Sequence, residues 1–354
     1  EIAAAAISKA LGRPVKWIED RNEHLAFSGQ AREETLDVEC AVTDDGRILG
    51  MKIKMVMDTG AYPGMGTMAG STVEGMMPGA YSIEALQFTF QAIVSNKATY
   101  VAYRGPWAAE TFCRERMVDL IAHELGLEPL EVRRRNIAYQ GAEPAKMVTG
   151  RPLSGVTARE SLEKVADLVD LPAFRARQEA ARAEGRYLGI GMANFIEAAP
   201  GPRGGGGLGD EQMRMRLEAD GTVTVFTAQM PHGQSHETTL AQIAADEFGV
   251  PFEQVRIVAG DSDQVPFGFT GGSRSATMAG GAALHTARDL RKKVLEVSSH
   301  LMEAAVEDLE IVDGRVGVRG VPARAKPLAE IAAAAGRPGA LPADVDATLE
   351  VSRA

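Results

Sequence analysis

The chain has 354 residues, of which 45% are hydrophobic and 24% are charged, and its formal net charge is −10. This composition is typical of a globular protein of about two domains, and the acidic balance disfavours a nucleic-acid partner, because phosphate recognition requires a basic face. No apolar run reaches the length of an integral membrane segment and no signal peptide opens the sequence, so we expect a cytoplasmic protein.

The sequence contains two cysteines, Cys40 and Cys113. Two thiols in an intracellular sequence argue against a disulfide framework. An iron–sulfur cluster requires about four thiolates, so these two cannot hold one. Any redox chemistry must therefore pass its electrons to another chain or domain.

The first part of the chain predicts one helix, at residues 1–11, followed mainly by strands. Strands are expected at residues 15–18, 35–43, 48–57 and 86–94. Residues 60–79 are rich in Gly, Met and Ala and predict an irregular loop. Its clustered thioethers could bind soft copper, but Met more often fills irregular gaps; the residues are Met65, Met68, Met76 and Met77.

A strand-like run then stops at Arg104-Gly105-Pro106, before a predicted helix. Proline suits the beginning of a helix. The planar donor fork of Arg104, which has aromatic neighbours, fits an anionic or planar oxygenated ligand. The alternative is a structural ion pair of Arg104 with Glu110 or Glu115.

Further helices are expected at residues 108–125, 130–136, 158–169, 172–184, 240–248 and 276–305, and strands at 188–198, 213–218, 222–227 and 254–258. A weak internal echo relates residues 123–133 to residues 246–256, since both read as a helix, Glu-apolar-Gly-apolar, then Val-Arg. Glycines that end helices explain part of it. The pattern indicates an α+β fold of two similar mixed α/β halves, which we place at residues 1–155 and 156–354.

Residues 232–239 separate a strand-like run from a helix-like run. A strand that breaks at Pro231 and Gly233 into a helix leaves backbone N–H groups unpaired, which favours an anion there. Gly233 lets the backbone approach a ligand, and Gln234 offers both a donor and an acceptor. Residues 271–277 repeat the pattern. Each stretch alone is an ordinary cap, but together they predict a ligand with several phosphate or oxygen-rich groups.

Several motifs resemble the xanthine dehydrogenase and aldehyde oxidase family, in its molybdenum-binding large subunit and in the branch that includes carbon monoxide dehydrogenases. Residues 101–136 read Tyr-Arg-Gly, a helix ending in Glu-Leu-Gly, then Val-Arg-Arg-Arg-Asn. Residues 233–238 resemble that family's Gly-Gln-Gly-His-Glu-Thr cofactor loop. Residues 260–268 and 272–275 resemble its next cofactor stretch, and the motifs keep their order over most of the chain.

The resemblance implies two halves of the xanthine dehydrogenase molybdenum-domain type and a catalytic subunit that binds molybdenum on molybdopterin, in the cytosine dinucleotide form. It implies oxidative hydroxylation of a small-molecule substrate, an aldehyde or a heteroaromatic ring, with oxygen from water. The electrons would pass to a small iron–sulfur subunit and a medium subunit with FAD, in a dimer of heterotrimers.

The resemblance also implies roles for individual residues. Arg104 would face the substrate, and Gln234 would bond the oxo or pterin end of the cofactor, both as catalytic residues. No side chain of this chain would bind the metal directly. Cofactor contacts would come from Gly233, Gln234, Ser235, His236, Thr238, Gly272, Ser273, Arg274 and Ser275.

The chain departs from the family pattern in several places. The family's Gly-Phe-Gly stretch and its Gly-x-Gly-Glu motif, which carries the general base, are absent from the sequence. We therefore expect a central fragment, truncated at both ends, that does not turn over alone. Copper-containing carbon monoxide dehydrogenases have Cys directly after the Arg of the Tyr-Arg motif, where this chain has Gly105, and Cys113 is a poor substitute. Ser235 replaces a Gly, which is a milder change.

Three alternatives to the hydroxylase interpretation stay open. The first is a carbon monoxide dehydrogenase large subunit. The second is a non-catalytic pterin-cofactor-binding subunit, which would keep the cofactor loops and lack the general base. The third is a Gly-rich nucleotide-binding module unrelated to molybdenum, against which the Tyr-Arg-Gly likeness counts.

Overall fold

The computed structural model describes residues 2–31, 33–101, 105, 107–138, 145–197, 211–265 and 268–353. The chain divides into two compact units, Glu1–Glu197 (the first unit) and Ala198–Ala354 (the second unit). This division lies later in the chain than the boundary expected between residues 155 and 156. Helix α6 (Ala158–Val169) accounts for the difference, because Leu162 and Ala166 are buried in the core of the first unit.

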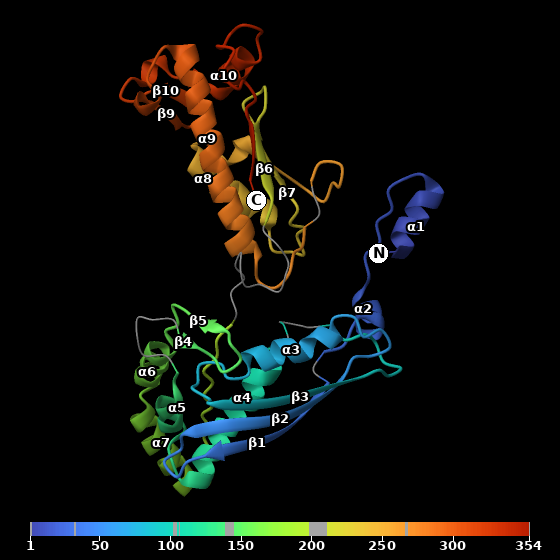
Figure 1. Cartoon of the computed structure of the whole chain (residues 1–354), viewed down its shortest axis with the longest axis vertical. Helices are drawn as coiled ribbons and strands as arrows, with labels where there is room; N and C mark the ends of the chain where they lie inside the picture. The colour runs from blue at the N-terminus through green and yellow to red at the C-terminus, as the bar shows by residue number, and fades with distance from the viewer. Residues whose placement is uncertain are drawn as a thin grey trace. The chain divides into compact units, whose positions relative to one another are not determined.

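A three-stranded sheet in the order β1-β2-β3 forms the centre of the first unit (Figure 1). Strands β1 (Glu34–Val42) and β2 (Ile48–Asp58) lie at two of the predicted strands and form an antiparallel hairpin, and β3 (Ala85–Ile93) runs parallel to β2. Gly46 in the hairpin turn has a φ of 86°, which glycine adopts without strain. The side chains of β2 alternate between the core and the opposite face, as expected of a strand with one buried side.

Helices α3 (Gly66–Met76) and α4 (Trp107–Leu125) pack against each other and against this sheet. The irregular loop predicted at residues 60–79 is therefore wrong for most of its length. Helix α3 lies so close to β3 that a β-carbon on Gly70 would be 2.3 Å from the Phe90 ring. Small residues permit that contact, so the composition that suggested a loop serves helix packing. The four methionines differ in exposure: Met76 and Met77 are buried, whereas Met65 and Met68 are exposed.

The rest of the first unit consists of helices and one very short ribbon: α1 (Ile2–Leu11), α2 (Arg21–Phe27), α5 (Pro129–Asn136), α7 (Leu171–Ala183), and β4 (Ala145–Lys146) paired with β5 (Pro152–Leu153). Helix α2 was not predicted, although Asp20 and Glu23 form a capping box at its start. The strands predicted at residues 15–18 and 188–198 are wrong, since the described residues there belong to no strand.

The second unit is built on a sheet in the order β12-β6-β7-β8. Its strands are β6 (Met213–Leu217), β7 (Val223–Thr227), β8 (Val255–Ala259) and β12 (Glu350–Arg353). Strands β6 and β7 lie at two of the predicted strands and form a second antiparallel hairpin, and β8 runs parallel to β7. Every residue of the central strand β7 is buried, so the segment that leaves its end has a fixed starting point.

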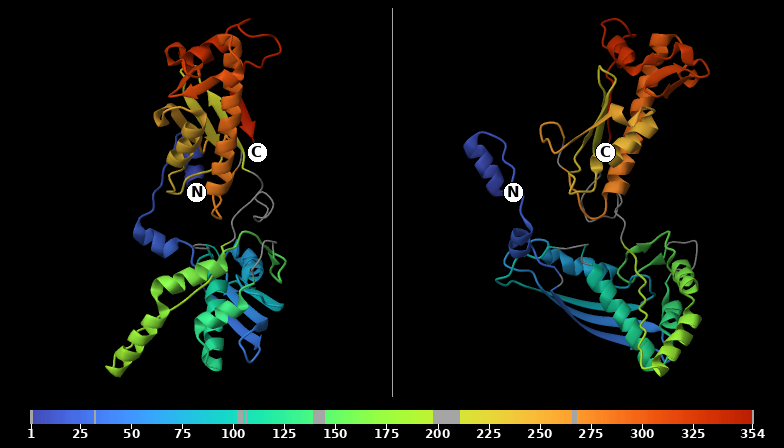
Figure 2. Two further views of the ribbon diagram at one scale, coloured as in Figure 1. Left: turned by 90° about the vertical axis from the view of Figure 1, so that its left-hand side faces the viewer. Right: turned by 180° about the vertical axis from the view of Figure 1, so that it is seen from behind.

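Helix α8 (His236–Phe248) connects β7 to β8, and a π-helical turn, η2 (Ser275–Ala279), leads into the long helix α9 (Gly280–Met302). Helices α8 and α9 pack against each other beside the sheet, as both views of Figure 2 show. The remaining elements are η1 (Phe252–Gln254), η3 (Val306–Asp308), β9 (Leu309–Val312), β10 (Arg315–Val318), η4 (Pro322–Arg324), β11 (Lys326–Pro327) and α10 (Leu328–Ala335).

The two units share one order of elements: an antiparallel hairpin, a helix, a strand parallel to the second strand of the hairpin, and a covering helix. The sequences are β1-β2-α3-β3-α4 and β6-β7-α8-β8-α9. The prediction of two similar α+β halves is confirmed. The echo that suggested it, however, aligns unlike elements, because Val132 lies in helix α5 and Val255 lies in strand β8.

Each unit has its own hydrophobic core. In the second unit, Val223 and Val225 of β7 meet Leu240 and Phe248 of α8 and Leu290 of α9, all nearly inaccessible to solvent. Within the described residues, every helix falls short of the length and apolar character that crossing a bilayer requires.

Candidate functional site

The first loop, residues 228–235, joins the end of β7 to the start of α8. Gly233 has a φ of 103° and Ser235 a φ of 59°, so both lie in the left-handed region. The carbonyl of Ser235 accepts hydrogen bonds from the N–H groups of Thr238 and Thr239, both at 3.0 Å, while its side chain caps nothing. The first N–H groups of α8 have no partner within the helix and are available to a ligand.

The site residues predicted on the first loop and on α8 differ in exposure. His236 is only 4% exposed. The Gln234 side chain is exposed, and its Oε1 accepts a hydrogen bond from the backbone N–H of His232. The other predicted residues here are exposed, as ligand contacts require: Gly233, Ser235 and Thr238.

The second loop, residues 268–274, leads into η2 and carries the other predicted site residues. Gly272 and Ser273 are consecutive left-handed residues, with φ of 64° and 57°, so the backbone turns sharply here. Both are exposed, and a β-carbon on Gly272 would meet no atom of the chain within 4 Å. Arg274 follows and is 4% exposed. The turn therefore exposes its backbone to open space, and the buried guanidinium of Arg274 follows it directly in the chain.

Gln229, which sequence reasoning missed, joins the two loops. It is fully buried at the start of the first loop. Its Nε2 donates to the Phe269 carbonyl at 2.9 Å, and its Oε1 accepts from the hydroxyls of Ser275 at 2.9 Å and Thr270 at 3.3 Å. Gln229 thus joins the two glycine-containing stretches predicted from sequence. No local sequence pattern marks Gln229, because its partners in the second loop and η2 are 40 to 46 residues away.

Glu211 is the second buried residue that sequence reasoning missed. Its Oε2 accepts a hydrogen bond from Gln229 Nε2 at 2.7 Å and lies 3.6 Å from Arg274 Nη2. Burial raises the pKa of Glu211 above its ordinary value, although the Gln229 hydrogen bond and the charge of Arg274 oppose that shift. The carboxylate partly compensates the buried guanidinium, because a buried charge without a partner is costly.

His236 has unused hydrogen-bonding capacity. Among the described residues, neither Nδ1 nor Nε2 of its ring has a hydrogen-bond partner, and Glu211 Oε1 has none either. Buried polar groups are nearly always paired in folded proteins. Unpaired ring atoms beside two exposed left-handed turns fit a site that a polar ligand completes.

These residues can together bind a large ligand with several negatively charged oxygen groups. The start of α8 supplies N–H groups and the positive end of a helix dipole. The second loop supplies an exposed turn, with Arg274 below it. Among the described residues, no group of three or more His, Cys, Asp or Glu side chains is placed to hold a metal ion.

Arg104, which is predicted to face the substrate, lies outside the described residues. The two carboxylates considered as alternative partners of Arg104 each lie beside another arginine. Glu110 lies 3.3 Å from Arg114, and Glu115 lies 3.0 Å from Arg133. Neighbouring Gly105 is described and has a φ of 65°.

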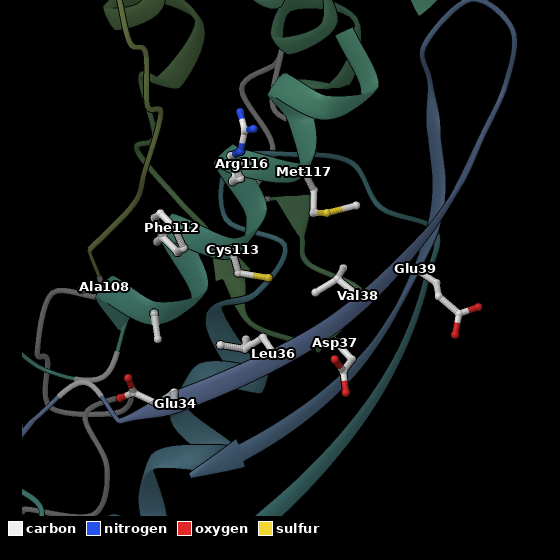
Figure 3. A pocket seen from close by; sticks show the side chains of 11 residues that line it. Glu34, Leu36, Asp37, Val38, Glu39, Ala108, Phe112, Cys113, Arg116 and Met117 are labelled. Atoms are coloured by element: carbon white, nitrogen blue, oxygen red, sulfur yellow. The ribbon is translucent and has the colours of Figure 1, made fainter. Parts of the chain in front are cut away.

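The first unit contains a groove of about 780 Å³ between β1 and α4 (Figure 3). Figure 3 shows Phe112 and Cys113 of α4 facing Leu36 and Val38 of β1 across it. None of the predicted site residues that the structure describes lines this groove. Burial raises the pKa of the Cys113 thiol to about 11, so it stays protonated near neutral pH and is a poor nucleophile or metal ligand.

Comparison with known proteins matches two family models to the chain. Both are described as a molybdopterin cofactor-binding domain, one over residues 1–137 and the other over residues 164–350. The second match contains both loops, together with Glu211 and Gln229. The family of cofactor expected from the sequence motifs is thus the one that the models identify.

The chain is similar over nearly its whole length to large subunits of molybdenum enzymes. It is 33% identical to the nicotine 6-hydroxylase large subunit of Paenarthrobacter nicotinovorans and 34% identical to a carbon monoxide dehydrogenase large chain of Hydrogenophaga pseudoflava, covering 94% of this chain in each case and 42% and 43% of the relatives. The crystal structure of quinoline 2-oxidoreductase from Pseudomonas putida 86 matches with a TM-score of 0.83 and 36% identity, over 99% of this chain and 46% of that one. The chain spans less than half the length of these relatives.

Proposed function

Because this chain belongs to the molybdopterin cofactor-binding family, we propose that it is part of the catalytic subunit of a molybdenum hydroxylase. The reaction would be oxidative hydroxylation of an aldehyde or a heteroaromatic ring, with oxygen from water. The bound molybdenum cofactor supplies the two-electron oxidation. The residues of this chain hold and orient that cofactor.

One observation carries this proposal. The two predicted cofactor loops meet in the second unit through Gln229, and they leave the buried ring of His236 without a partner among the described residues. A dinucleotide form of molybdopterin, such as the cytosine dinucleotide, carries phosphates that suit the helix start and Arg274. The orphaned atoms and the open space beside Gly272 agree with a ligand of that size and polarity.

The individual roles follow from exposure. Gln234 is exposed beside the start of α8, where its amide can bond the oxo or pterin end of the cofactor. The backbone at Gly233, Ser235, Gly272 and Ser273 would contact the pterin and phosphates, with Thr238 and Ser275 adding hydroxyls. Arg274 and His236 would contact the cofactor through their buried side chains. Arg104 would face the substrate.

Heteroaromatic substrates are favoured over carbon monoxide. The nicotine and quinoline named in two relatives both contain nitrogen heterocycles. Gly105 stands where the copper-dependent route requires Cys, and its φ of 65° is a conformation that residues with a β-carbon rarely adopt. A Cys at this position would strain the backbone, and Cys113 is a buried, protonated thiol.

The electron route requires partner subunits. The two cysteines, Cys40 and Cys113, are too few for an iron–sulfur cluster, and burial raises the pKa of each thiol to about 11. The electrons would therefore pass to an iron–sulfur subunit and a flavin subunit. We propose a dimer of heterotrimers, which native mass spectrometry of the purified complex would test.

The first experiment is the molybdenum and copper content of the full native complex, measured by elemental mass spectrometry. Molybdenum without copper is the expected result. Equal molybdenum and copper would replace the hydroxylase proposal with carbon monoxide oxidation. A well-folded complex without molybdenum or pterin would overturn the proposal and favour a non-catalytic subunit.

A further inference from the structure

Gln229 binds both sides of the turn in the second loop. Phe269 and Thr270 precede the left-handed pair Gly272 and Ser273, and Ser275 follows it, and all three bond to the Gln229 amide. The residues from Gly268 to Arg274 belong to no strand or helix. Gln229 therefore supplies hydrogen bonds that regular secondary structure does not supply to this segment.

The position of Gln229 along the chain makes this contact useful. It lies two residues beyond β7, and its backbone N–H donates to Thr227 Oγ1 at 3.2 Å. Since every residue of β7 is buried, Gln229 is attached to the core of the unit. Gln229 is the second residue of the first loop, so its side chain links the second loop to the first.

Glu211 completes the arrangement from a third segment. It accepts from Gln229 Nε2 and lies beside Arg274, so it fixes the orientation of the amide and the place of the guanidinium together. Gln229 is fully buried, and its amide is already bonded to Glu211, Phe269, Thr270 and Ser275, so it has no group left for a ligand.

We propose that Gln229 and Glu211, here called the loop bridge, are positioning residues that set the separation of the two cofactor loops and thereby the rate at which the cofactor is lost. The inference rests on the proposed function, because it assumes that the loops hold that cofactor. Gln229 itself does not touch the cofactor. It acts by keeping the backbone at Gly233 and at Gly272 in position to bind the same ligand.

The test is Gln229→Met in the full-length subunit within its complex. Methionine has a similar length and lacks the amide, so the bonds to the second loop and to Glu211 are lost together. We expect the molybdenum and pterin of the purified complex to dissociate about tenfold faster, measured as content per folded protein over time. Activity is not needed for this readout.

The matched control is Ser298→Ala. Ser298 is fully buried in the same unit, and its Oγ donates to the Val294 carbonyl at 2.7 Å. At 1.5 Å per residue, α9 places it roughly 30 Å from Ser275. We expect this variant to lower the unfolding temperature of the second unit while the cofactor dissociates at the wild-type rate. The inference would be overturned if, in both variants, the rate of cofactor loss rose in the same proportion to the fall in unfolding temperature.

A milder variant covers the case in which Gln229→Met does not fold. Thr270→Val removes one hydroxyl bond to Gln229, and we expect cofactor loss two- to threefold faster. Wild-type retention in whichever of the two variants folds would overturn the inference and leave the proposed function standing. Absence of molybdenum and pterin from the wild-type complex would instead overturn the proposed function.

Discussion

Each unit buries a cluster of charged side chains, and the two clusters differ in how fully their hydrogen-bonding groups are used. In the first unit, the paired cluster consists of Glu110, Arg114, Glu115, Asp119 and Arg133. In the second unit, the site cluster consists of Glu211, Gln229, His236 and Arg274. Both contain a carboxyl group, Glu110 or Glu211, whose pKa burial raises.

The arginines of the paired cluster are fully buried and fully bonded. Each nitrogen of Arg133 has an acceptor: Nε bonds Glu115 Oε2 at 3.0 Å, Nη1 bonds Asp119 Oδ1 at 2.9 Å, and Nη2 bonds the Met192 carbonyl at 2.8 Å. Arg114 likewise reaches the Met77 carbonyl at 3.0 Å. These bonds join α3, α4, α5 and residues 192–194, so the paired cluster is structural.

The site cluster is equally buried but has unpaired atoms in His236 and Glu211 among the described residues. Its surroundings differ too, because exposed left-handed turns lie on either side of it. Burial of charge alone therefore does not identify a site. The distinguishing features are incomplete pairing and a nearby backbone that is open to a ligand.

The largest expected effect is on the paired cluster. Arg133→Met would leave Glu115 buried without this partner, so we expect the first unit to lose about 3–5 kcal/mol of stability. Hydrogen exchange of the amides in α4 and α5 of the full-length subunit would measure it.

The control is Arg135→Met, on the same helix. Arg135 pairs with Glu131 at 2.9 Å on the exposed side, so its loss is worth less than about 1 kcal/mol. If the two substitutions lowered the stability of the first unit equally, the paired cluster would not be a special source of its stability. The contrast drawn between the paired cluster and the site cluster would then be wrong.

The next effect concerns the open backbone of the site. Gly233→Val places a branched side chain where φ is 103° and where no atom of the chain lies within 4 Å of the new β-carbon. The side chain would occupy ligand space, and we expect cofactor retention to fall about 100-fold, equivalent to about 2.7 kcal/mol. Molybdenum content of the purified full-length enzyme measures it.

Gly339→Val is a matched control for backbone strain. Gly339 lies in the same unit with a φ of 77° and similar open space, but in a segment away from both loops. We expect strain without cofactor loss. Full molybdenum occupancy in Gly233→Val would contradict the assignment of this loop.

A smaller effect is expected for the exposed amide of the first loop. Gln234→Ala removes an orienting hydrogen bond near the metal, so we expect kcat/KM of the full-length enzyme to fall about tenfold, or about 1.4 kcal/mol. Gln242→Ala, at an exposed position of α8, should leave it unchanged. Wild-type turnover in Gln234→Ala would exclude that role.

The same contrast explains how much was predictable from sequence. The hairpins, the helix at α8 and the two loops follow from local patterns, because turn residues and helix starts are encoded within a few positions. Helix α3 was missed because glycines weaken a helix locally, whereas here Gly70 permits the close approach of α3 to β3. Its stability comes from packing that no local pattern reveals.

The site was predictable only on its exposed side. Gly233, Gln234 and Gly272 carry turn and donor signals in the sequence. Gln229 and Glu211 carry none, since their importance depends on contacts across 18 to 46 residues. The residues that we propose contact the cofactor thus came from sequence, whereas the buried residues that join the two loops required the fold.

The smallest expected effect separates backbone from side chain at Ser235, where the family pattern has Gly. Ser235 has a φ of 59° and its hydroxyl makes no capping bond, so Ser235→Gly relieves strain and loses no helix contact. The greater freedom of glycine in the unfolded chain offsets part of that gain. We expect the second unit to become more stable by less than about 1 kcal/mol, measured by denaturant unfolding.

Ser299→Gly, inside right-handed α9, should have the opposite sign and cost about 0.5–1 kcal/mol. Cofactor retention then decides what Ser235 contributes to the site. If Ser235→Gly keeps the cofactor as well as wild type, the backbone conformation at this position matters and the hydroxyl does not. If cofactor retention falls while the stability of the second unit rises, the hydroxyl itself contacts the ligand. The loss of cofactor could not then be explained by unfolding, because the variant would be more stable than wild type.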